Sequence, residues 1–352
     1  MPKECIILQS VLRKTVETTK EVKKVQFGVL FTLDYHDGFS PAYGEIFSQI
    51  RDQLYLAEQL NFAEVWFTEQ HFNPTDGLCP DPALLLAYAA ALTKRVRLGS
   101  AVNVAPLHHP LHLAERYSFL DHLSNGRIDI GLGSGFFPSV FEAFNVPFNG
   151  RLALRDEVIA SLKQSWITAS LQKTGQMSTP TLGTVSIPFP LQEPHPPLWI
   201  STVAMDRVEA ILKAGDSVLI DPMFSWFELS DLSDKIHSLR MSKSYSGQVG
   251  LLMYTRMGAS YEALPYFDRL LGRFLAKKPQ QKGELTDFWN VQQQKGLLLC
   301  CMPDEAIERL KVVQAVGIDQ VLLCIGFGGT PHNEVVKTLK ILASEVIPYL
   351  SC

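Results

Sequence analysis

The sequence predicts an α/β fold, specifically a TIM (β/α)8 barrel with insertions. In the first half of the chain, short apolar strand patterns alternate with helical patterns, and such crossovers favour a parallel sheet. Eight strand patterns can be counted along the whole chain. No linker or break in composition divides the 352 residues, so one barrel accounts for them better than a doubly wound sheet.

The eight predicted strands are short runs rich in β-branched and aromatic residues. The first four alternate cleanly with helices, whereas residues 170–197 are rich in Thr, Gly and Pro and predict a hairpin or long loop. In chain order the strands are Val25–Leu33, Ala63–Phe67, Val96–Val104, Arg127–Leu132, Leu198–Thr202, Val218–Ile220, Val249–Met257 and Gln320–Ile325.

Helical patterns, with apolar residues three and four positions apart, separate these strands. Asp81 is predicted to cap a helix that has Pro82 in its first position, and Asn125-Gly126 and Gly317 are predicted to end two others. Apart from the helix that begins at Pro82, the predicted helices are Glu45–Leu60, Leu111–Leu123, Leu152–Ala169, Asp206–Ala214, Phe227–Leu239, Tyr261–Leu275, Pro303–Val316 and Asn333–Leu350.

One domain, residues 25–352, is expected behind an N-terminal extension of residues 1–24. The extension mixes Glu with Lys and lacks the apolar core of a signal peptide, so we expect a cytoplasmic protein. The net charge of −4 gives no general attraction to nucleic acid or an anionic membrane. No apolar run approaches the ~20 residues of a membrane span.

The cysteines and histidines predict no metal site. None of the six cysteines belongs to a CxxC pair, so buried reduced thiols are expected. The histidines show neither HxH nor HExxH spacing, which leaves a metal without a ligand set.

The functional face of such a barrel lies at the C-terminal ends of its strands. His71 follows the second strand and is the predicted general acid or base, the alternative being a hydrogen bond within its loop. Glu69 continues the alternation of that strand and is predicted to be a buried carboxylate that supports the histidine.

Two further turns carry candidate residues. His108 and His109 are consecutive and should point apart, so we expect at least one of them to cap the following helix. Gly131-x-Gly133-x-Gly135 follows the fourth strand. Its glycines either allow close packing or, with the Ser134 hydroxyl and nearby backbone amides, hold a phosphate.

Five motifs in a fixed order carry a family resemblance. They are VWFTEQHF at 65–72, LGS at 98–100, PLHHP at 106–110, LDHLSNGR at 120–127 and PHPPLWI at 194–200. The chain resembles the bacterial luciferase-like family of flavin-dependent monooxygenases from residue 25 to residue 350. PLHHP with a serine in the turn after the fourth strand resembles the subgroup found in natural-product biosynthesis.

The resemblance implies a barrel, often dimeric, that holds reduced FMN or coenzyme F420 at its C-terminal end. The reduced flavin reacts with O2 to oxygenate a substrate, and a separate reductase supplies it. A non-prolyl cis peptide is implied at Ala101-Val102, beneath the flavin. The other implied cofactor contacts are Ser134, Gly135, Phe136, Thr202, Val203 and Ala204.

The chain also departs from the family pattern. Gln70 stands where luciferases have the first of two histidines after the glutamate, and Ser134 stands where an arginine is common. Serines expected after the fifth strand are Val203 and Ala204, so phosphate binding is expected to depend more on backbone N–H groups.

We therefore predict an enzyme, a flavin-dependent monooxygenase that uses reduced FMN and O2 on a small organic or carrier-tethered substrate, as a homodimer. Asn103 and His36 are predicted to orient the substrate. Phe136–Phe144 and Lys277–Cys301 are predicted lids, with ordinary hydrophobic cover as the alternative. An F420-dependent oxidoreductase and a non-catalytic flavin-binding subunit are the alternative functions, which cofactor binding would distinguish.

Overall fold

The computed structural model describes residues 24–173, 188–221, 229–242, 245–276, 290–293, 295–296 and 298–350. The predicted N-terminal extension therefore lies outside the described residues except for Lys24. Residues 174–187, half of the predicted loop at 170–197, and residues 277–289 of one predicted lid also lie outside them.

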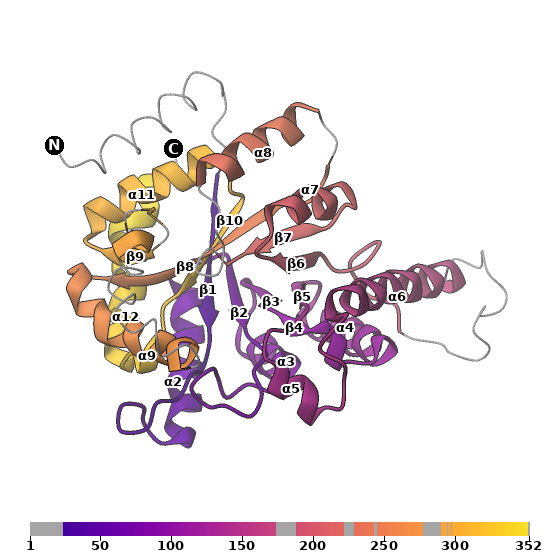
Figure 1. Cartoon of the computed structure of the whole chain (residues 1–352), viewed down its shortest axis with the longest axis horizontal. Helices are drawn as coiled ribbons and strands as arrows, with labels where there is room; N and C mark the ends of the chain where they lie inside the picture. Colours follow the sequence, from indigo (N-terminus) through magenta and orange to yellow (C-terminus); the bar gives the residue numbers. More distant parts are fainter. Residues whose placement is uncertain are drawn as a thin grey trace.

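Eight parallel strands close into a barrel surrounded by helices (Figure 1). The strands of the ring are β1 (Gln26–Phe31), β2 (Glu64–Phe67), β3 (Arg97–Ser100), β5 (Ile128–Gly133), β6 (Leu198–Thr202), β7 (Ser217–Ile220), β8 (Val249–Met257) and β10 (Gln320–Cys324). Each pairs in parallel with the next, and β10 pairs with both β8 and β1, which closes the ring. The predicted TIM barrel and its eight strands are confirmed.

Two short strands add to this ring. β4 (Asn103–Val104) pairs with β5 and forms the end of the third predicted strand, which is interrupted at the cis peptide bond between Ala101 and Val102. β9 (Leu298–Cys301) pairs with the end of β8. The predicted lid over Lys277–Cys301 is therefore wrong for its last four residues, because this buried apolar segment extends the sheet.

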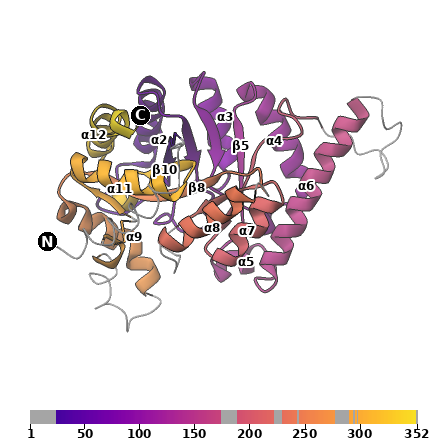
Figure 2. The ribbon, with the colours of Figure 1, turned by 90° about the horizontal axis from the view of Figure 1, so that it is seen from above.

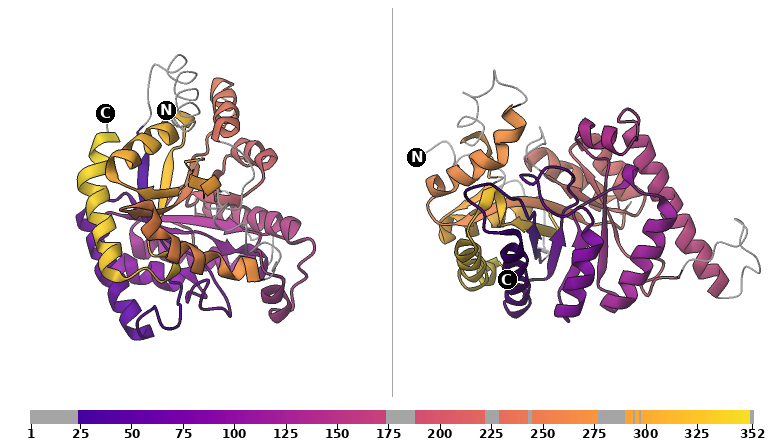
Figure 3. Two further views of the ribbon diagram at one scale, coloured as in Figure 1. Left: turned by 60° about the vertical axis from the view of Figure 1, so that its left-hand side comes forward. Right: turned by 90° about the horizontal axis from the view of Figure 1, so that it is seen from below.

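The helices follow the strands around the outside of the barrel. They are α2 (Tyr43–Gln59), α3 (Pro82–Leu92), α4 (Pro110–Ser124), α5 (Pro138–Ala143), α6 (Arg151–Lys173), α7 (Met205–Lys213), α8 (Leu229–Met241), α9 (Leu264–Ala276), α11 (Pro303–Val316) and α12 (His332–Ile341). Figure 2 shows α6 extending well beyond the ring, and Figure 3 shows α12 beside α2. Within the described residues no helix has the length and apolarity needed to cross a membrane.

Local sequence signals explain where several helices begin and end. Asp81 Oδ1 accepts a hydrogen bond from the Ala83 amide at 3.0 Å, which is the predicted cap. Asn125 adopts a left-handed conformation (φ 57°) after α4, and Gly317 does so (φ 95°) after α11. The aromatic segment after β5 contains the short helix α5, which the sequence pattern did not predict.

The barrel interior is filled by large side chains. Trp66 and Trp199 meet edge to face, with ring centroids 5.7 Å apart. The indole of Trp66 occupies the space beside Gly99, where a Cβ atom would lie only 2.1 Å from the ring. This packing separates a polar layer at the N-terminal end of the strands from the opposite, C-terminal end.

The polar layer contains two buried carboxylates, Glu64 and Asp129. Glu64 Oε2 accepts hydrogen bonds from the Trp66 indole, at 2.6 Å, and from the Gln320 amide. Asp129 Oδ2 accepts one from Arg97 Nε at 2.6 Å. Burial, followed by the charge of Asp129, raises the pKa of Glu64 from 4.5 to about 8, and burial also raises the pKa of Asp129.

Candidate functional site

The centre of the candidate site is the carboxylate of Glu69, just beyond the C-terminal end of β2. Its Oε1 accepts a hydrogen bond from His71 Nε2 at 2.7 Å. Its Oε2 contacts His108 Nε2 at 2.8 Å and accepts a hydrogen bond from the Val104 amide at 2.9 Å. The predicted supporting contact between Glu69 and His71 is therefore present, and His108 adds a second imidazole.

The Glu69 carboxylate is fully shielded from solvent, with a side-chain exposure of 0%. Burial alone would raise its pKa, but hydrogen bonds from His108, His71 and the Val104 amide outweigh this effect and leave the pKa below its usual value. The site therefore holds a buried anion, stabilised by donors from two loops that are distant in sequence.

His71 lies between this anion and a group of aromatic rings. Its ring meets Phe144 edge to face at 4.9 Å and lies 5.7 Å from Phe72, and the two phenylalanine rings are 5.4 Å apart. Phe72 has a left-handed backbone (φ 61°), unusual for a bulky residue, and its side chain is 71% exposed. Nδ1 of His71 has no hydrogen-bond partner among the described residues, so this nitrogen is available to a ligand.

Asn103 is fully buried, and its side chain links the ends of β3 and β5 to α4. Its amide nitrogen donates to Ser100 Oγ at 2.8 Å and to the Gly131 carbonyl at 2.9 Å, while its Oδ1 accepts from the Tyr117 hydroxyl at 2.9 Å. Both ends of the amide are therefore engaged by neighbouring groups of the barrel, and the role of Asn103 in orienting the substrate stays a prediction.

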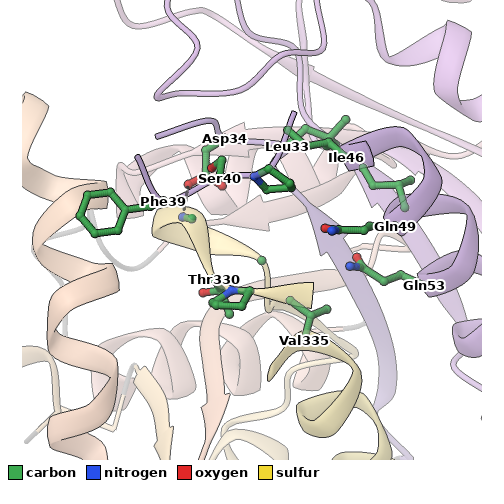
Figure 4. Close-up of a pocket in the computed structure, with 14 residues that line it drawn as sticks. Leu33, Asp34, Phe39, Ser40, Ile46, Gln49, Gln53, Thr330 and Val335 are labelled. Carbon is green, nitrogen blue, oxygen red and sulfur yellow. Dashed lines mark hydrogen bonds between the residues drawn. The ribbon is translucent and has the colours of Figure 1, made fainter. Parts of the chain in front are cut away.

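His36 is likewise engaged by a neighbouring side chain, near β1. Its Nε2 lies 2.8 Å from Asp34 Oδ2, which also accepts a hydrogen bond from the Gly329 amide at 3.1 Å. Beside this contact a pocket of about 530 Å³, including its open mouth, lies between α2 and the segment linking β10 to α12 (Figure 4). Gln49, Gln53 and Thr330 supply polar groups to its apolar wall.

The glycines at the end of β5 and just after it are explained mainly by close packing. A Cβ atom on Gly131 would lie 1.9 Å from the Ser100 carbonyl oxygen, and one on Gly133 would lie 2.5 Å from the Val102 side chain. Gly135 has a left-handed backbone (φ 73°). The strand ends carrying Ala101-Val102 and Gly133 are therefore in direct contact.

The residues predicted to contact the cofactor lie at the ends of three neighbouring strands, β3, β5 and β6. The peptide bond between Ala101 and Val102 is cis, as expected. Ser134, Gly135 and the 48% exposed Phe136 follow β5. Thr202 ends β6, and Val203 and Ala204 lead into α7; Thr202 Oγ1 accepts a hydrogen bond from the Ala204 amide at 3.1 Å.

Two arginines, one turn apart on α6, reach these same strand ends. Arg151 Nε donates to the Gly135 carbonyl at 3.2 Å, and Arg155 Nη1 donates to the Ser201 carbonyl at 3.4 Å. Arg155 is almost completely buried and is also hydrogen bonded to Asp156. These cations and the beginning of α7 form the kind of environment that stabilises a phosphate.

The described residues hold no group of three His, Cys, Asp or Glu side chains that could bind a metal. Cys79, Cys300, Cys301 and Cys324 are buried and free, as the sequence predicted for its thiols. Burial raises the pKa of Cys79, Cys300 and Cys301 to about 12, so these thiols are poor nucleophiles.

Two residues of this site, Arg151 and Arg155, escaped the sequence analysis, as did the contact that His108 makes. His109 Nδ1 accepts from the Leu111 amide at 3.3 Å, so it provides the predicted helix cap. His108 instead turns to Glu69, which lies 39 residues earlier. Arg151 and Arg155 gave no signal, because only the path of α6 brings a helix start to the ends of β5 and β6.

Comparison with known proteins gives consistent matches. The family model described as luciferase-like monooxygenase matches residues 25–247. The oxygenase component of flavin-dependent trigonelline monooxygenase from Acinetobacter baylyi (strain ATCC 33305 / BD413 / ADP1) is 26% identical, covering 87% of this chain and 91% of its own. Uncharacterized protein y4vJ of Sinorhizobium fredii (strain NBRC 101917 / NGR234) is 32% identical, and the match spans 56% of either chain.

Among solved structures, the monooxygenase RslO1 from Streptomyces bottropensis superposes with a TM-score of 0.73. The superposition covers 92% of this chain and 99% of that chain, at 23% identity. At this identity the match supports the shared barrel fold.

Proposed function

Because this chain belongs to the luciferase-like monooxygenase family, we propose that it uses reduced FMN and O2 to oxygenate a small organic or carrier-tethered substrate. The chain is a flavin-dependent, luciferase-like oxidoreductase. The observation that carries the proposal is the buried Glu69 anion, which holds His71 beyond the end of β2 with Nδ1 available, and β2 pairs with the strand that leads to Ala101-Val102.

The residues present fit a flavin mononucleotide. Arg151 and Arg155 supply positive charge where Ser134 replaces the common family arginine, and the first amides of α7 add N–H donors. Phe136 and the Ala101-Val102 peptide offer apolar surface for a flat ring system. When bound, reduced FMN supplies the electrons that activate O2.

His71 is the proposed catalytic residue, moving a proton at Nδ1 between the site and the substrate or cofactor. Glu69 acts through His71 and is a positioning residue, because its carboxylate is fully shielded and its oxygens are engaged. Phe72, Phe136 and Phe144 are exposed around this site and would exclude water once a ligand covers them. Substrate, O2 and a separate flavin reductase are the proposed partners.

A cofactor titration tests this function. Reduced FMN at near-millimolar concentration should raise the melting temperature and, with a reductase and NAD(P)H, support O2 consumption. Oxidised FMN and F420 are titrated in parallel. Quenching of F420 absorbance with substrate would instead support the F420-dependent oxidoreductase, and no shift with any cofactor would contradict a catalytic role.

A second comparison isolates the phosphate contact. Arg155→Met should weaken reduced FMN binding about tenfold while leaving reduced riboflavin, which lacks the phosphate, unaffected. Arg309→Met is the matched control, because Arg309 contacts Glu305 and the Leu298 carbonyl on α11 and β9. Equal losses for both flavins would contradict the assignment of Arg155.

We also propose that the enzyme is a cytoplasmic homodimer. Large apolar side chains are exposed on the neighbouring helices α2, α3 and α4, including Phe47 (46%), Leu84 (67%) and Phe119 (61%). Burying such a surface favours self-association. Analytical ultracentrifugation should detect a dimer that Leu84→Asp weakens, and a monomeric wild-type protein would contradict the proposal.

A further inference from the structure

We propose that His108 is a positioning residue that acts on His71 through the carboxylate of Glu69, and so keeps Nδ1 of His71 free of a proton. This inference rests on the proposed function only in naming His71 as the catalytic residue. The arrangement itself follows from the contacts of three side chains.

The geometry gives each oxygen of Glu69 its own imidazole. His71 Nε2 lies 2.7 Å from Oε1, and His108 Nε2 lies 2.8 Å from Oε2. The Val104 amide donates to Oε2 as well, at 2.9 Å. His108 is held in place by its own backbone, because its amide donates to the Ala105 carbonyl at 3.1 Å.

These contacts determine the tautomer of His71. An ionised carboxylate can only accept, so the proton of a neutral His71 ring must lie on Nε2, which leaves the Nδ1 lone pair open. If Glu69 became protonated, it could donate to Nε2 instead, and the proton of the imidazole would move to Nδ1. The charge on Glu69 therefore decides which nitrogen of His71 can act as a base.

His108 keeps that charge in place. Burial raises the pKa of Glu69, and the hydrogen bond from His108 is the largest influence that lowers it. Three other ionisable groups interact with this region, Cys79, Asp81 and Tyr117. Burial raises the pKa of both Cys79 and Tyr117, so both are neutral, and Asp81 is paired with Arg116 at 3.1 Å.

The neighbouring histidine gives a built-in control. His109 is adjacent to His108, yet its ring caps α4 through the Leu111 amide and lies near His112, with centroids 5.5 Å apart. Neither contact involves Glu69. A general effect of losing a histidine from this turn would therefore show in both variants, whereas an effect transmitted through Glu69 requires His108.

The test is ¹⁵N NMR of the folded protein labelled at histidine, without any cofactor. Near neutral pH the wild-type His71 ring should carry its proton on Nε2. His108→Leu removes the donor, so at the same pH the neutral His71 ring should carry more of its proton on Nδ1, a tautomer that its ¹⁵N shifts distinguish from the doubly protonated imidazolium. His108→Gln retains an N–H donor at the same reach and should preserve the wild-type tautomer, as should His109→Leu. If His108→Leu fails to fold, His108→Asn, whose amide is too short to reach Glu69, replaces it.

An Nδ1-protonated His71 in the wild type, or an unchanged tautomer in His108→Leu, would overturn the proposal. In turnover, His108→Leu should lose about tenfold in kcat with little change in KM, and His108→Gln should restore it. The NMR result does not depend on flavin chemistry. If no flavin binds but the tautomer responds as expected, the proposed function fails while this inference stands.

Discussion

Two buried glutamates at opposite ends of β2 show how the two ends of this barrel differ in function. Glu64 begins β2 in the polar layer at the N-terminal end, and Glu69 lies just beyond the other end of the strand. Both are shielded from solvent. Yet the pKa of Glu64 is raised to about 8, whereas the pKa of Glu69 is lowered.

The difference lies in the surrounding groups and not in the depth of burial. Glu64 has a carboxylate neighbour, Asp129, and Arg97, whose positive charge acts on Glu64, donates its hydrogen bond to that neighbour. Glu69 accepts hydrogen bonds from two imidazoles and a backbone amide. The N-terminal layer therefore favours an uncharged carboxyl group suited to packing, while the C-terminal end maintains an anion that can orient a catalytic histidine.

The largest expected effect concerns the C-terminal end. His71→Ala should lower kcat by about 10²–10⁴-fold, the range of general acid–base catalysis, while binding of reduced FMN persists. Product formation under steady-state conditions measures the loss, with His109→Ala as the control that keeps its turnover. Full turnover in His71→Ala would remove this residue from its role.

Glu64→Gln should stabilise the protein by several kcal/mol near pH 8 and change little near pH 4. The folded-state pKa lies above the unfolded value of 4.5, so the folded protein binds more protons between these pH values, and wild-type stability falls as pH rises from about 4.5 to 8. The glutamine accepts the same indole hydrogen bond without titrating. Urea unfolding at several pH values checks this, and equal pH slopes for wild type and variant would contradict it.

The same substitution at Glu69 should have the opposite sign. Glu69→Gln should destabilise by about 1–3 kcal/mol above pH 5, because an amide group then faces donors with its own N–H. The pKa of Glu69 is lower in the folded protein than in the unfolded chain. The ionised carboxylate therefore stabilises the fold at pH values above the unfolded-state pKa, and this stabilisation is lost as the pH falls through the folded-state pKa. Urea unfolding of both Gln variants side by side provides the measurement, and a stabilised Glu69→Gln would be inconsistent with a buried anion.

The fold could be predicted because each strand carries its own signal. The eight ring strands are short β-branched and aromatic runs, and the helices between them repeat at helical period. β9 escaped because Leu298–Cys301 follows a polar stretch whose sequence shows no regular pattern. Nothing local distinguishes such a run from a helical or loop segment, and only its pairing with β8 makes it a strand.

The candidate site could be predicted only in part. The alternation of side chains along β2 was enough to predict that Glu69 is buried and supports His71. The partnership of Glu69 with His108 could not be predicted, because it depends on how the turn after β4 directs two consecutive histidines. The same holds for Arg155, whose buried contact with Ser201 depends on the position of α6 against β6.

The most direct test compares Glu64→Gln and Glu69→Gln in one stopped-flow experiment, in which each variant is loaded with reduced FMN and substrate and mixed with O2. With chemistry at the C-terminal end of the barrel, Glu64→Gln should form product at the wild-type rate, and Glu69→Gln should be slower by about tenfold or more. Equal rates for the two variants, or a slower Glu64→Gln, would contradict the assignment of the catalytic site to Glu69 and His71.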